Sequence, residues 1–391
     1  MKKIRLLIVD DSSIVHLILE KSIRDHDNID IVGQAYDGAE GVALAIKLSP
    51  DVIVMDINMP GMDGLKAIQE IMSDKPTPII VFSSASKDIV DLSFKSIDLG
   101  AVDIIEKPWS TDFESLKQNI QERLIRAIKI FADIKVVRRV RKSTVRELKE
   151  KNENLKMIGE SLKKRHLEFV SERKEHYNQD TVNEKEDIRE EVQTPGEYKD
   201  FPIIALTAST GGPQTIRALL ENIHFKDIFA GFIIVQHIAE GFMTGFCDWL
   251  KGFSPFPVTM AKAAEKIEPR HVYVAPGEYH LGVSPGGSFS LIDTPPIMGI
   301  RPSANIMLKH MAKFYKERLV AIILTGMGND GADGLSLIKE NNGHIIAQDE
   351  ESSILFGMPK AAIQTGLVDT ILPLSDIPEF LVQYCSKKSQ K

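Results

Sequence analysis

Short runs rich in isoleucine and valine alternate with stretches of helical period, and this alternation occurs twice along the chain. Strands buried on both faces of a parallel sheet have this continuous apolar pattern, and the helices that cover the sheet separate them. The expected strands are residues 4–9, 29–32, 52–55, 79–82 and 104–105 in the first series, and 203–206, 232–235, 271–274, 320–324 and 344–347 in the second. The sequence therefore predicts an α/β fold with two doubly wound parallel-sheet domains.

The length of the chain also calls for more than one domain. Its 391 residues exceed the roughly 100 to 200 that one hydrophobic core usually organises. We place the first domain at residues 1–131 and the second at residues 200–391, joined by a long charged helical linker at residues 132–199.

The linker is distinguished by its charge. Between residues 141 and 190, 25 of the 50 residues are charged, 13 basic and 12 acidic. Apolar residues recur there at every seventh position, which is the spacing of a coiled-coil seam: Leu148, Leu155, Leu162 and Phe169. The positions three residues earlier are mostly not apolar, so a solvated helical or partly disordered linker is favoured over a dimerising coiled coil.

The composition argues against several classes of protein. Lys and Arg total 48 against 55 Asp and Glu, a net charge of -7, which disfavours a nucleic-acid partner. Cys247 and Cys385 are the only cysteines, too few for a disulfide framework or a four-cysteine zinc site, so a cytoplasmic location is expected. No secretory signal is recognisable and no run approaches about 18 apolar residues, so membrane insertion is not expected.

Chemically reactive side chains follow four of the five expected strands in the first domain. Asp10 and Asp11 follow the first strand, Asp56 the third, Ser83 the fourth and Lys107 the fifth. The carboxyl ends of parallel strands share one edge of the sheet, where ligands bind. Three carboxylates there repel one another unless a cation such as Mg²⁺ neutralises them, while a hydroxyl and an ammonium suit phosphoryl oxygens. The set predicts an aspartate that accepts a phosphoryl group, although each acid alone is also typical of a solvated loop.

This segment resembles the receiver domain of two-component response regulators over roughly residues 3 to 131. The resemblance is carried by I-V-D-D-S, by V-M-D-I-N-M-P-G-M-D-G, by the serine of I-I-V-F-S-S and by E-K-P. It implies a flavodoxin-like domain with Asp56 as the phosphoryl acceptor. The residues that it implies for Mg²⁺ are Asp10, Asp11, Asp56 and the Asn58 backbone carbonyl, and those for the phosphoryl group are Ser83 and Lys107. One departure is Ile104, which stands where many receivers carry an aromatic switch residue.

The second domain carries a serine on a strand-to-helix turn, in T-A-S-T-G-G-P at residues 207–213. A nucleophile elbow reads G-x-S-x-G, and here Thr207 occupies the first glycine position. His237 follows another strand, and Asp330 lies in the loop T-G-M-G-N-D-G after a third. Ser209, His237 and Asp330 can therefore meet at one sheet edge as nucleophile, base and orienting acid. Taken singly, they also fit a helix N-cap, a hydrogen-bonded loop histidine and a turn residue.

These motifs resemble the catalytic domain of chemotaxis protein-glutamate methylesterases, the CheB family, over about residues 202 to 384. The matching motifs are A-S-T-G-G-P, V-Q-H, Y-V-A-P-G, R-P-S, L-T-G-M-G-N-D-G and Q-D-E-E-S-S-I-L-F-G-M-P-K-A-A. A receiver followed by this domain is the family's own arrangement. The resemblance implies a Rossmann-like domain with Ser209 as the nucleophile, His237 as the general base and then acid, and Asp330 as the residue that orients His237. The Met327 backbone N–H is implied as the oxyanion donor.

The sequence departs from the family pattern in four places. Thr207 replaces a usual glycine, Asn305 follows R-P-S where an acid is common, and Lys360 replaces a usual arginine. The linker is also longer than usual. The three substitutions bear on rate or substrate fit, whereas the triad itself is intact.

The resemblance implies phosphorylation-activated hydrolysis of glutamate methyl esters on the cytoplasmic part of methylated chemoreceptors, in chemotaxis adaptation. It extends to deamidation of glutamines there, to a chemotaxis histidine kinase as phosphodonor, and to an unphosphorylated receiver that covers the active-site face. Mg²⁺ would serve receiver phosphorylation, and ester hydrolysis would need no cofactor. Two other interpretations stay open: a phosphorylation-dependent interaction module with an inactive esterase-like domain, and phosphate or nucleotide binding at the T-G-G turn.

Overall fold

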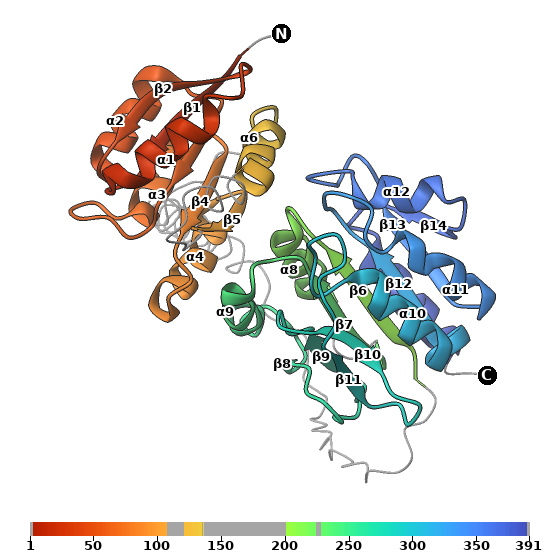
Figure 1. Ribbon diagram of the computed structural model, residues 1–391. Helices are drawn as coiled ribbons and strands as arrows, with labels where there is room; N and C mark the ends of the chain where they lie inside the picture. Colours follow the sequence, from red (N-terminus) through yellow and green to blue (C-terminus); the bar gives the residue numbers. More distant parts are fainter. Residues whose placement is uncertain (1–2, 108–120, 135, 137–200, 224–227, 389–391) are drawn as a thin grey trace, which may run out of the picture. The chain divides into compact units, whose positions relative to one another are not determined.

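A computed structural model describes residues 3–107, 121–134, 136, 201–223 and 228–388. These residues form two α/β domains, before and after the predicted linker (Figure 1). The seven-residue repeat of the linker lies outside the described residues, and the domain boundaries drawn from the sequence stay predictions. No helix of the described residues is both long enough and apolar enough to cross a membrane.

The first domain contains a five-stranded parallel sheet in the order β2-β1-β3-β4-β5, which is the flavodoxin-like order of doubly wound sheets. All five predicted strands are present. The strands are β1 (Ile4–Val9), β2 (Ile29–Ala35), β3 (Val52–Met55), β4 (Ile79–Ser83) and β5 (Asp103–Glu106). The helices are α1 (Ser13–Ile23), α2 (Gly38–Leu48), α3 (Gly64–Asp74), α4 (Lys87–Leu99) and α6 (Arg126–Phe131), with a π-helical turn η1 (Gln121–Ile125) before the last.

Polar residues define where three of these helices begin. Ser12, Asp37 and Asp63 each accept a hydrogen bond from the backbone N–H three residues later, at the starts of α1, α2 and α3. These N-caps satisfy backbone donors that a helix leaves unpaired at its first turn. Ser12 caps α1 two residues after Asp10, and Asp63 caps α3 at the end of the loop that begins with Asp56, so each of these loops runs from a strand to a capped helix.

The second domain contains a seven-stranded parallel sheet in the order β14-β13-β12-β6-β7-β9-β8. The strands are β6 (Ile203–Ala208), β7 (Gly231–Gln236), β8 (Val258–Met260), β9 (His271–Val274), β12 (Leu319–Ile323), β13 (His344–Gln348) and β14 (Thr370–Leu372). β10 (His280–Val283) and β11 (Phe289–Ile292) form a separate antiparallel pair. The helices are α8 (Gly212–Glu221), α9 (Glu240–Leu250), α10 (Ala304–Tyr315), α11 (Leu335–Glu340), α12 (Met358–Gln364) and α13 (Ile377–Lys388), with 3₁₀ turns η2 (Lys316–Arg318) and η3 (Ala332–Gly334).

The sheet of the second domain confirms the predicted parallel α/β class but departs from the Rossmann strand order. In a Rossmann sheet the first strand lies between the second and the fourth. Here β6, the first strand of the sheet in chain order, lies between the second strand of the sheet, β7, and the fifth, β12. The five predicted strands are present, whereas β8, β10, β11 and β14 were not predicted, because each is short and contains a threonine, serine or glycine in place of an unbroken apolar run.

Candidate active site and phosphorylation site

Ser209 directly follows β6, where the strand order of the sheet reverses. β6 pairs with β7 on one side and β12 on the other, and ligands bind above such a reversal in a parallel sheet. The Ser209 N–H donates to the Thr325 carbonyl at 3.1 Å, and the Ser209 carbonyl accepts from the Gly212 N–H at 2.8 Å. Gly211 has a φ of 74°, a left-handed conformation that lets the chain turn sharply into α8. The turn leaves Ser209 half-buried, on the wall of a cavity of about 350 Å³.

Gln236, which the sequence analysis did not single out, connects the serine turn with the histidine loop. Its side-chain Nε2 donates to the Ser209 carbonyl at 2.8 Å and to the His237 carbonyl at 3.2 Å. A Cβ atom on Gly212 would lie only 1.9 Å from Gln236 Oε1, so the glycine leaves room for the glutamine side chain. The buried glutamine therefore fixes the two loops relative to each other. Its place immediately before the histidine in V-Q-H was the only sequence signal for this role.

His237 follows β7 and lines the same cavity as Ser209. Its ring Nε2 lies 3.0 Å from Oδ2 of Asp330, which is in the loop after β12. The Asp330 side chain is 3% exposed and that of His237 is 10% exposed, so the carboxylate is enclosed while the imidazole keeps access to the cavity. The three residues predicted as a triad thus end up at the carboxyl edge of one sheet.

The Asp330 carboxylate lies at the N-terminus of α10. Its Oδ2 accepts the Ala304 N–H at 2.7 Å, and its Oδ1 accepts the Asn305 N–H at 3.0 Å and the Ser303 hydroxyl at 2.8 Å. Burial raises the pKa of Asp330, but the hydrogen bond and charge of His237 and the backbone N–H donors lower that pKa more. The net pKa is below the ordinary value, and the positive end of the helix dipole acts in the same direction. Asp330 is therefore an ionised acceptor for the histidine at neutral pH.

The loop after β12 also brings a backbone donor beside the serine. Gly326 packs so closely on Ser209 that a Cβ atom there would lie 2.8 Å from Ser209 Cβ. The next residue, Met327, lines the cavity together with Ser209. Within the part of the chain that the structure describes, the Met327 N–H has no hydrogen-bond acceptor. A free N–H at this place is the kind of donor that an oxyanion hole requires.

The three residues that depart from the family pattern differ in their surroundings: two are buried and hydrogen-bonded, and the third is exposed. Thr207 is fully buried and its hydroxyl is 3.4 Å from a β12 carbonyl, so this side chain belongs to the sheet. The Asn305 side-chain oxygen accepts the N–H groups of Gly331 and Gly334, each at 3.0 Å. An amide oxygen can make both bonds without adding a second negative charge beside the buried carboxylate of the loop. Lys360 is exposed on α12.

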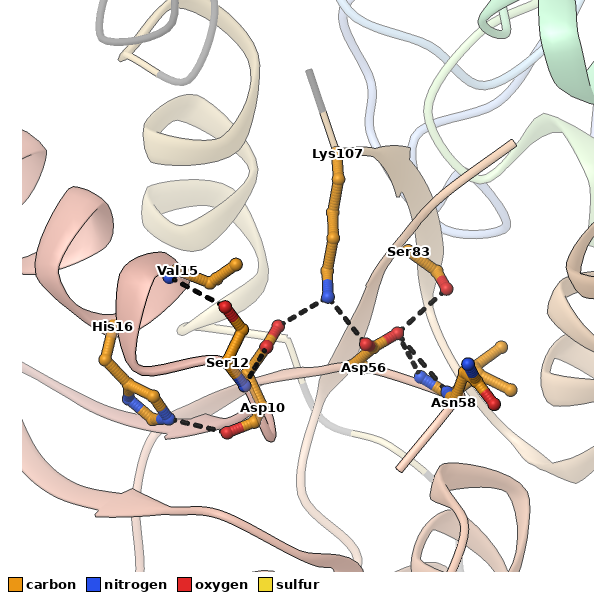
Figure 2. Close-up of polar contacts among 9 residues, drawn as sticks. Asp10, Ser12, Val15, His16, Asp56, Asn58, Ser83 and Lys107 are labelled. Carbon is orange, nitrogen blue, oxygen red and sulfur yellow. Dashed lines mark hydrogen bonds and ion pairs between the residues drawn. The ribbon is translucent and has the colours of Figure 1, made fainter. Parts of the chain in front are cut away.

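The five polar residues predicted in the first domain end or follow strands at the carboxyl edge of its sheet, and Figure 2 shows four of them, Asp10, Asp56, Ser83 and Lys107. Carboxylate oxygens of Asp10, Asp11 and Asp56 lie within 4.8 Å of one another. Lys107 Nζ lies 2.7 Å from Asp10 Oδ2 and 2.6 Å from Asp56 Oδ2. The Ser83 hydroxyl donates to the other oxygen of Asp56, Oδ1, at 2.9 Å. A carboxylate, a hydroxyl and an ammonium therefore surround one point of the edge.

The donor set of this edge fits Mg²⁺. Three carboxylates within 4.8 Å offer the hard oxygen atoms that this ion prefers. Burial raises the pKa of Asp10 above its ordinary value, and the neighbouring Asp56 carboxylate acts in the same direction, while Lys107 lowers that pKa. Burial lowers the pKa of Lys107, but the Asp56 and Asp10 carboxylates raise it more, so this ammonium keeps its proton. Asn58 donates its N–H to Asp56 at 3.4 Å, and its carbonyl as a ligand stays a prediction.

Comparison with known proteins defines the class. Residues 204–381 match the family model described as CheB methylesterase, and residues 6–121 match the response regulator receiver domain. The chain is therefore a response regulator whose receiver is followed by an enzyme domain.

Full-length relatives then define the family. The chain is 33% identical to a protein-glutamate methylesterase/protein-glutamine glutaminase of Pyrococcus horikoshii over 98% of this chain and 94% of the relative. It is 36% identical to protein-glutamate methylesterase/protein-glutamine glutaminase 1 of Syntrophomonas wolfei over 97% of this chain and 98% of the relative. The crystal structure of the Thermotoga maritima CheB methylesterase catalytic domain is similar at 36% identity, 47% coverage of this chain, 98% of that chain and a TM-score of 0.46. The protein belongs to the CheB family.

Proposed function

We propose that Ser209, His237 and Asp330 are the catalytic triad with which this protein hydrolyses glutamate methyl esters and deamidates glutamines on chemoreceptors. As a CheB protein-glutamate methylesterase/protein-glutamine glutaminase with a receiver domain, it acts in chemotaxis adaptation. The observation that carries the triad assignment is the 3.0 Å contact between His237 and Asp330 beside the cavity that Ser209 lines. No cofactor enters this reaction, because nucleophile, base and oxyanion donor all come from the chain.

The first half of the reaction forms an acyl-enzyme. The His237 Nε2–H faces the ionised Asp330, which leaves Nδ1 with the lone pair that takes the Ser209 proton. The serine oxygen attacks the γ-carbonyl of the methylated glutamate, and the Met327 N–H stabilises the oxyanion that forms. When the tetrahedral intermediate collapses, the C–O bond to the methoxy group breaks. His237 returns the proton to the leaving group, and methanol departs.

The second half of the reaction restores the enzyme. Water gives a proton to His237 as its oxygen attacks the acyl carbon, and the bond to the serine oxygen then breaks with return of that proton to Ser209. The product is a free glutamate. A glutamine substrate follows the same route, with ammonia as the first leaving group. Asp330 stabilises the positive charge that His237 carries in both halves.

In the receiver, we assign Asp56 as the phosphoryl acceptor, with a chemotaxis histidine kinase in the cytoplasm as the donor. Asp10, Asp11, Asp56 and the Asn58 carbonyl would hold Mg²⁺, which when bound supplies positive charge against the phosphoryl oxygens. The Ser83 hydroxyl and the Lys107 ammonium already contact the two oxygens of Asp56. Both therefore stand where they can bind the oxygens of a phosphoryl group on that carboxylate.

Replacing Asp56 by asparagine is expected to abolish activation by a phosphodonor while basal methanol release persists. An amide is a poor nucleophile toward phosphorus and a weaker Mg²⁺ ligand than a carboxylate, so the ratio of activated to basal turnover should fall to about 1. Methanol release from methylated receptor membranes, with and without acetyl phosphate, measures this ratio. Asp30→Asn, at an exposed position of β2, is the matched control. Undiminished activation of the Asp56→Asn enzyme would place the control site elsewhere.

Contacts between the receiver and the methylesterase domain support control by covering. The rings of Phe94 on α4 and Trp249 on α9 have centroids 5.6 Å apart. Arg217 on α8 forms an ion pair with Asp98 on α4. Receiver residues also line the cavity of Ser209: Asp103, Ile105, Arg123, Arg126, Ala127 and Ile130. A receiver held in this way restricts the approach of a protein substrate to the serine.

Arg217→Ala should raise the basal turnover of the unphosphorylated enzyme by about 3-fold, because loss of a partly exposed ion pair weakens the covered state only modestly. Asp98→Ala removes this ion pair and also the hydrogen bond that Asp98 accepts from the Trp249 ring N–H at 3.5 Å, so its effect should be at least as large. The double variant should not exceed the Asp98→Ala variant, since the ion pair is already lost there. Glu221→Gln removes the other carboxylate that bonds Arg217 without touching the receiver, and it should leave basal turnover unchanged. Additive effects of the two alanine substitutions would argue against a contact between these side chains in solution.

One assay separates the enzyme from the inactive interaction module. An esterase releases methanol from methylated receptor membranes, whereas a binding module associates with them and releases none. Measured with acetyl phosphate and Mg²⁺, sustained release at many turnovers per enzyme supports the proposal. Absence of release from properly folded, phosphorylated protein would leave the binding module as the better account.

A further inference from the structure

The segment between β11 and α10 carries an apolar turn, which we call the Met298 tip (residues 297–300). Ile297 and Ile300 each donate their N–H to the other's carbonyl, at 3.0 and 2.9 Å. Met298 and Gly299 between them have φ values of 49° and 78°. Two consecutive residues with positive φ in a two-residue loop are the signature of a type I′ turn. The tip is therefore a tight hairpin end with a methionine at its first central position.

Methionine is an unusual residue for this position of a turn. Glycine, asparagine or aspartate normally fills the positive-φ positions of such a turn, because other side chains are strained there. Met298 is 68% exposed, and its neighbour Ile297 is 39% exposed. The turn thus holds two apolar side chains in water, one of them on strained backbone. Strained residues of this kind cluster at ligand-contacting sites.

The tip is held firmly at its base. The Arg301 guanidinium donates to the Thr294 carbonyl at 3.4 Å, across the two sides of the segment. His280, which is fully buried, has Nε2 3.2 Å from the Pro295 carbonyl and accepts the Ser303 N–H on Nδ1 at 2.9 Å. The same Ser303 bonds the carboxylate of the proposed triad through its hydroxyl. The tip therefore keeps a fixed position relative to the catalytic groups.

The Met298 tip also lines the same cavity as the proposed catalytic residues. Met298, Gly299, Ile300 and Arg301 line the cavity that Ser209 and His237 line. A glutamate side chain that enters this cavity to reach the serine brings its flanking residues past the tip.

We propose that the Met298 tip is a substrate-docking element, which binds an apolar side chain next to the modified glutamate on the receptor surface. The inference rests on the proposed function, because the occupant is the receptor segment on which Ser209 acts. An exposed methionine is suited to this contact, since its flexible thioether adapts to partners of differing shape. The tip selects among receptor glutamates by their apolar neighbours, whereas the triad performs the same chemistry on each.

The test uses the full-length enzyme, activated with acetyl phosphate, and methylated receptor membranes at varied concentration. Met298→Gly should raise KM for methanol release by about 5-fold with little change in kcat, because an apolar contact made equally in the ground and transition states is lost. Met298→Leu keeps an apolar side chain on the same backbone and should stay within about 2-fold of the wild-type KM. Ile371→Thr, at a 50%-exposed apolar position of β14, is the control for loss of exposed apolar surface elsewhere.

The thermal unfolding temperature of each variant shows whether a change in KM comes from a folding defect. Glycine relieves the positive φ of residue 298, so the Met298→Gly enzyme should unfold at the same temperature as the wild type or higher. An unchanged KM for Met298→Gly would overturn the docking role. An unchanged KM with raised activity of the unphosphorylated enzyme would likewise overturn it and assign the tip to the receiver instead. Absence of methanol release from the wild-type enzyme would refute the proposed function itself, which distinguishes the two failures.

Discussion

Ser209→Ala is expected to lower methanol release by about 10⁴-fold or more, because no other group can form the acyl-enzyme once the hydroxyl is gone. The turn that carries residue 209 should survive the change. Its hydrogen bonds to Thr325 and Gly212 use only main-chain atoms of residue 209, and so does the bond from Gln236. Turnover on methylated receptor membranes, measured with acetyl phosphate present, gives the size of the loss.

Two controls make the result specific. Phosphorylation of the Ser209→Ala protein by acetyl phosphate should match that of the wild type, because Asp56, the proposed acceptor, lies in the other domain. Ser375→Ala removes an exposed hydroxyl far along the chain from the proposed site and should keep full turnover. If the Ser209→Ala enzyme retained a tenth of the wild-type rate, another residue would have to be the nucleophile.

The second large effect is expected for Asp330→Asn, which should lower turnover by about 10⁴-fold. Oδ1 of the carboxylate accepts hydrogen bonds from Ser303 and Asn305, and Oδ2 accepts the Ala304 N–H and lies 3.0 Å from Nε2 of His237. An amide has one oxygen only, so its NH₂ group must face donors on one side. Where it faces the histidine it donates to Nε2, which moves the ring proton to Nδ1 and removes the lone pair that receives the serine proton.

The tautomer of His237 can be measured directly, and destabilisation of the protein alone would not change it. The ¹⁵N chemical shifts of the His237 ring should report a proton on Nε2 in the wild type and on Nδ1 in Asp330→Asn. Asp333→Asn makes the same chemical change at an exposed position three residues away and should alter neither the tautomer nor the rate. A wild-type tautomer in an inactive Asp330→Asn enzyme would show that the carboxylate acts in some other way.

The main strands were predictable because parallel strands buried on both faces read as unbroken apolar runs, such as residues 52–55 and 320–324. The same patterns predicted which residues share an edge of a sheet and so form the candidate sites, since polar residues that directly follow such runs lie at the carboxyl edge. Ser209, His237 and Asp330 are far apart in the sequence, yet all three follow strands of one sheet. For predicting which residues meet, their position at strand ends was therefore more informative than their separation along the chain.

Some residues could not be predicted from the sequence, because their roles depend on tertiary contacts. Gln236 occupies a strand end like many others, and only the folded chain reveals that its amide reaches two loops. His280 lies in a strand of four residues, and its role in holding the base of the Met298 tip depends on its contacts with Pro295 and Ser303. The conformation of Met298 likewise depends on the hairpin around it, because an isolated M-G pair does not specify two positive φ values.

The hydrogen bonds that hold the Asp330 carboxylate at the N-terminus of α10 bear on how the enzyme is regulated. Three donors besides the histidine hold this carboxylate, and all of them come from the methylesterase domain itself. The acid–base pair is therefore preassembled by folding of that domain and does not await a signal. We therefore expect phosphorylation of the receiver to control the access of substrate to a triad that is already assembled. We expect the pH dependence of the chemical step to be the same in the phosphorylated and unphosphorylated enzyme, while the receiver sets how often that step is reached.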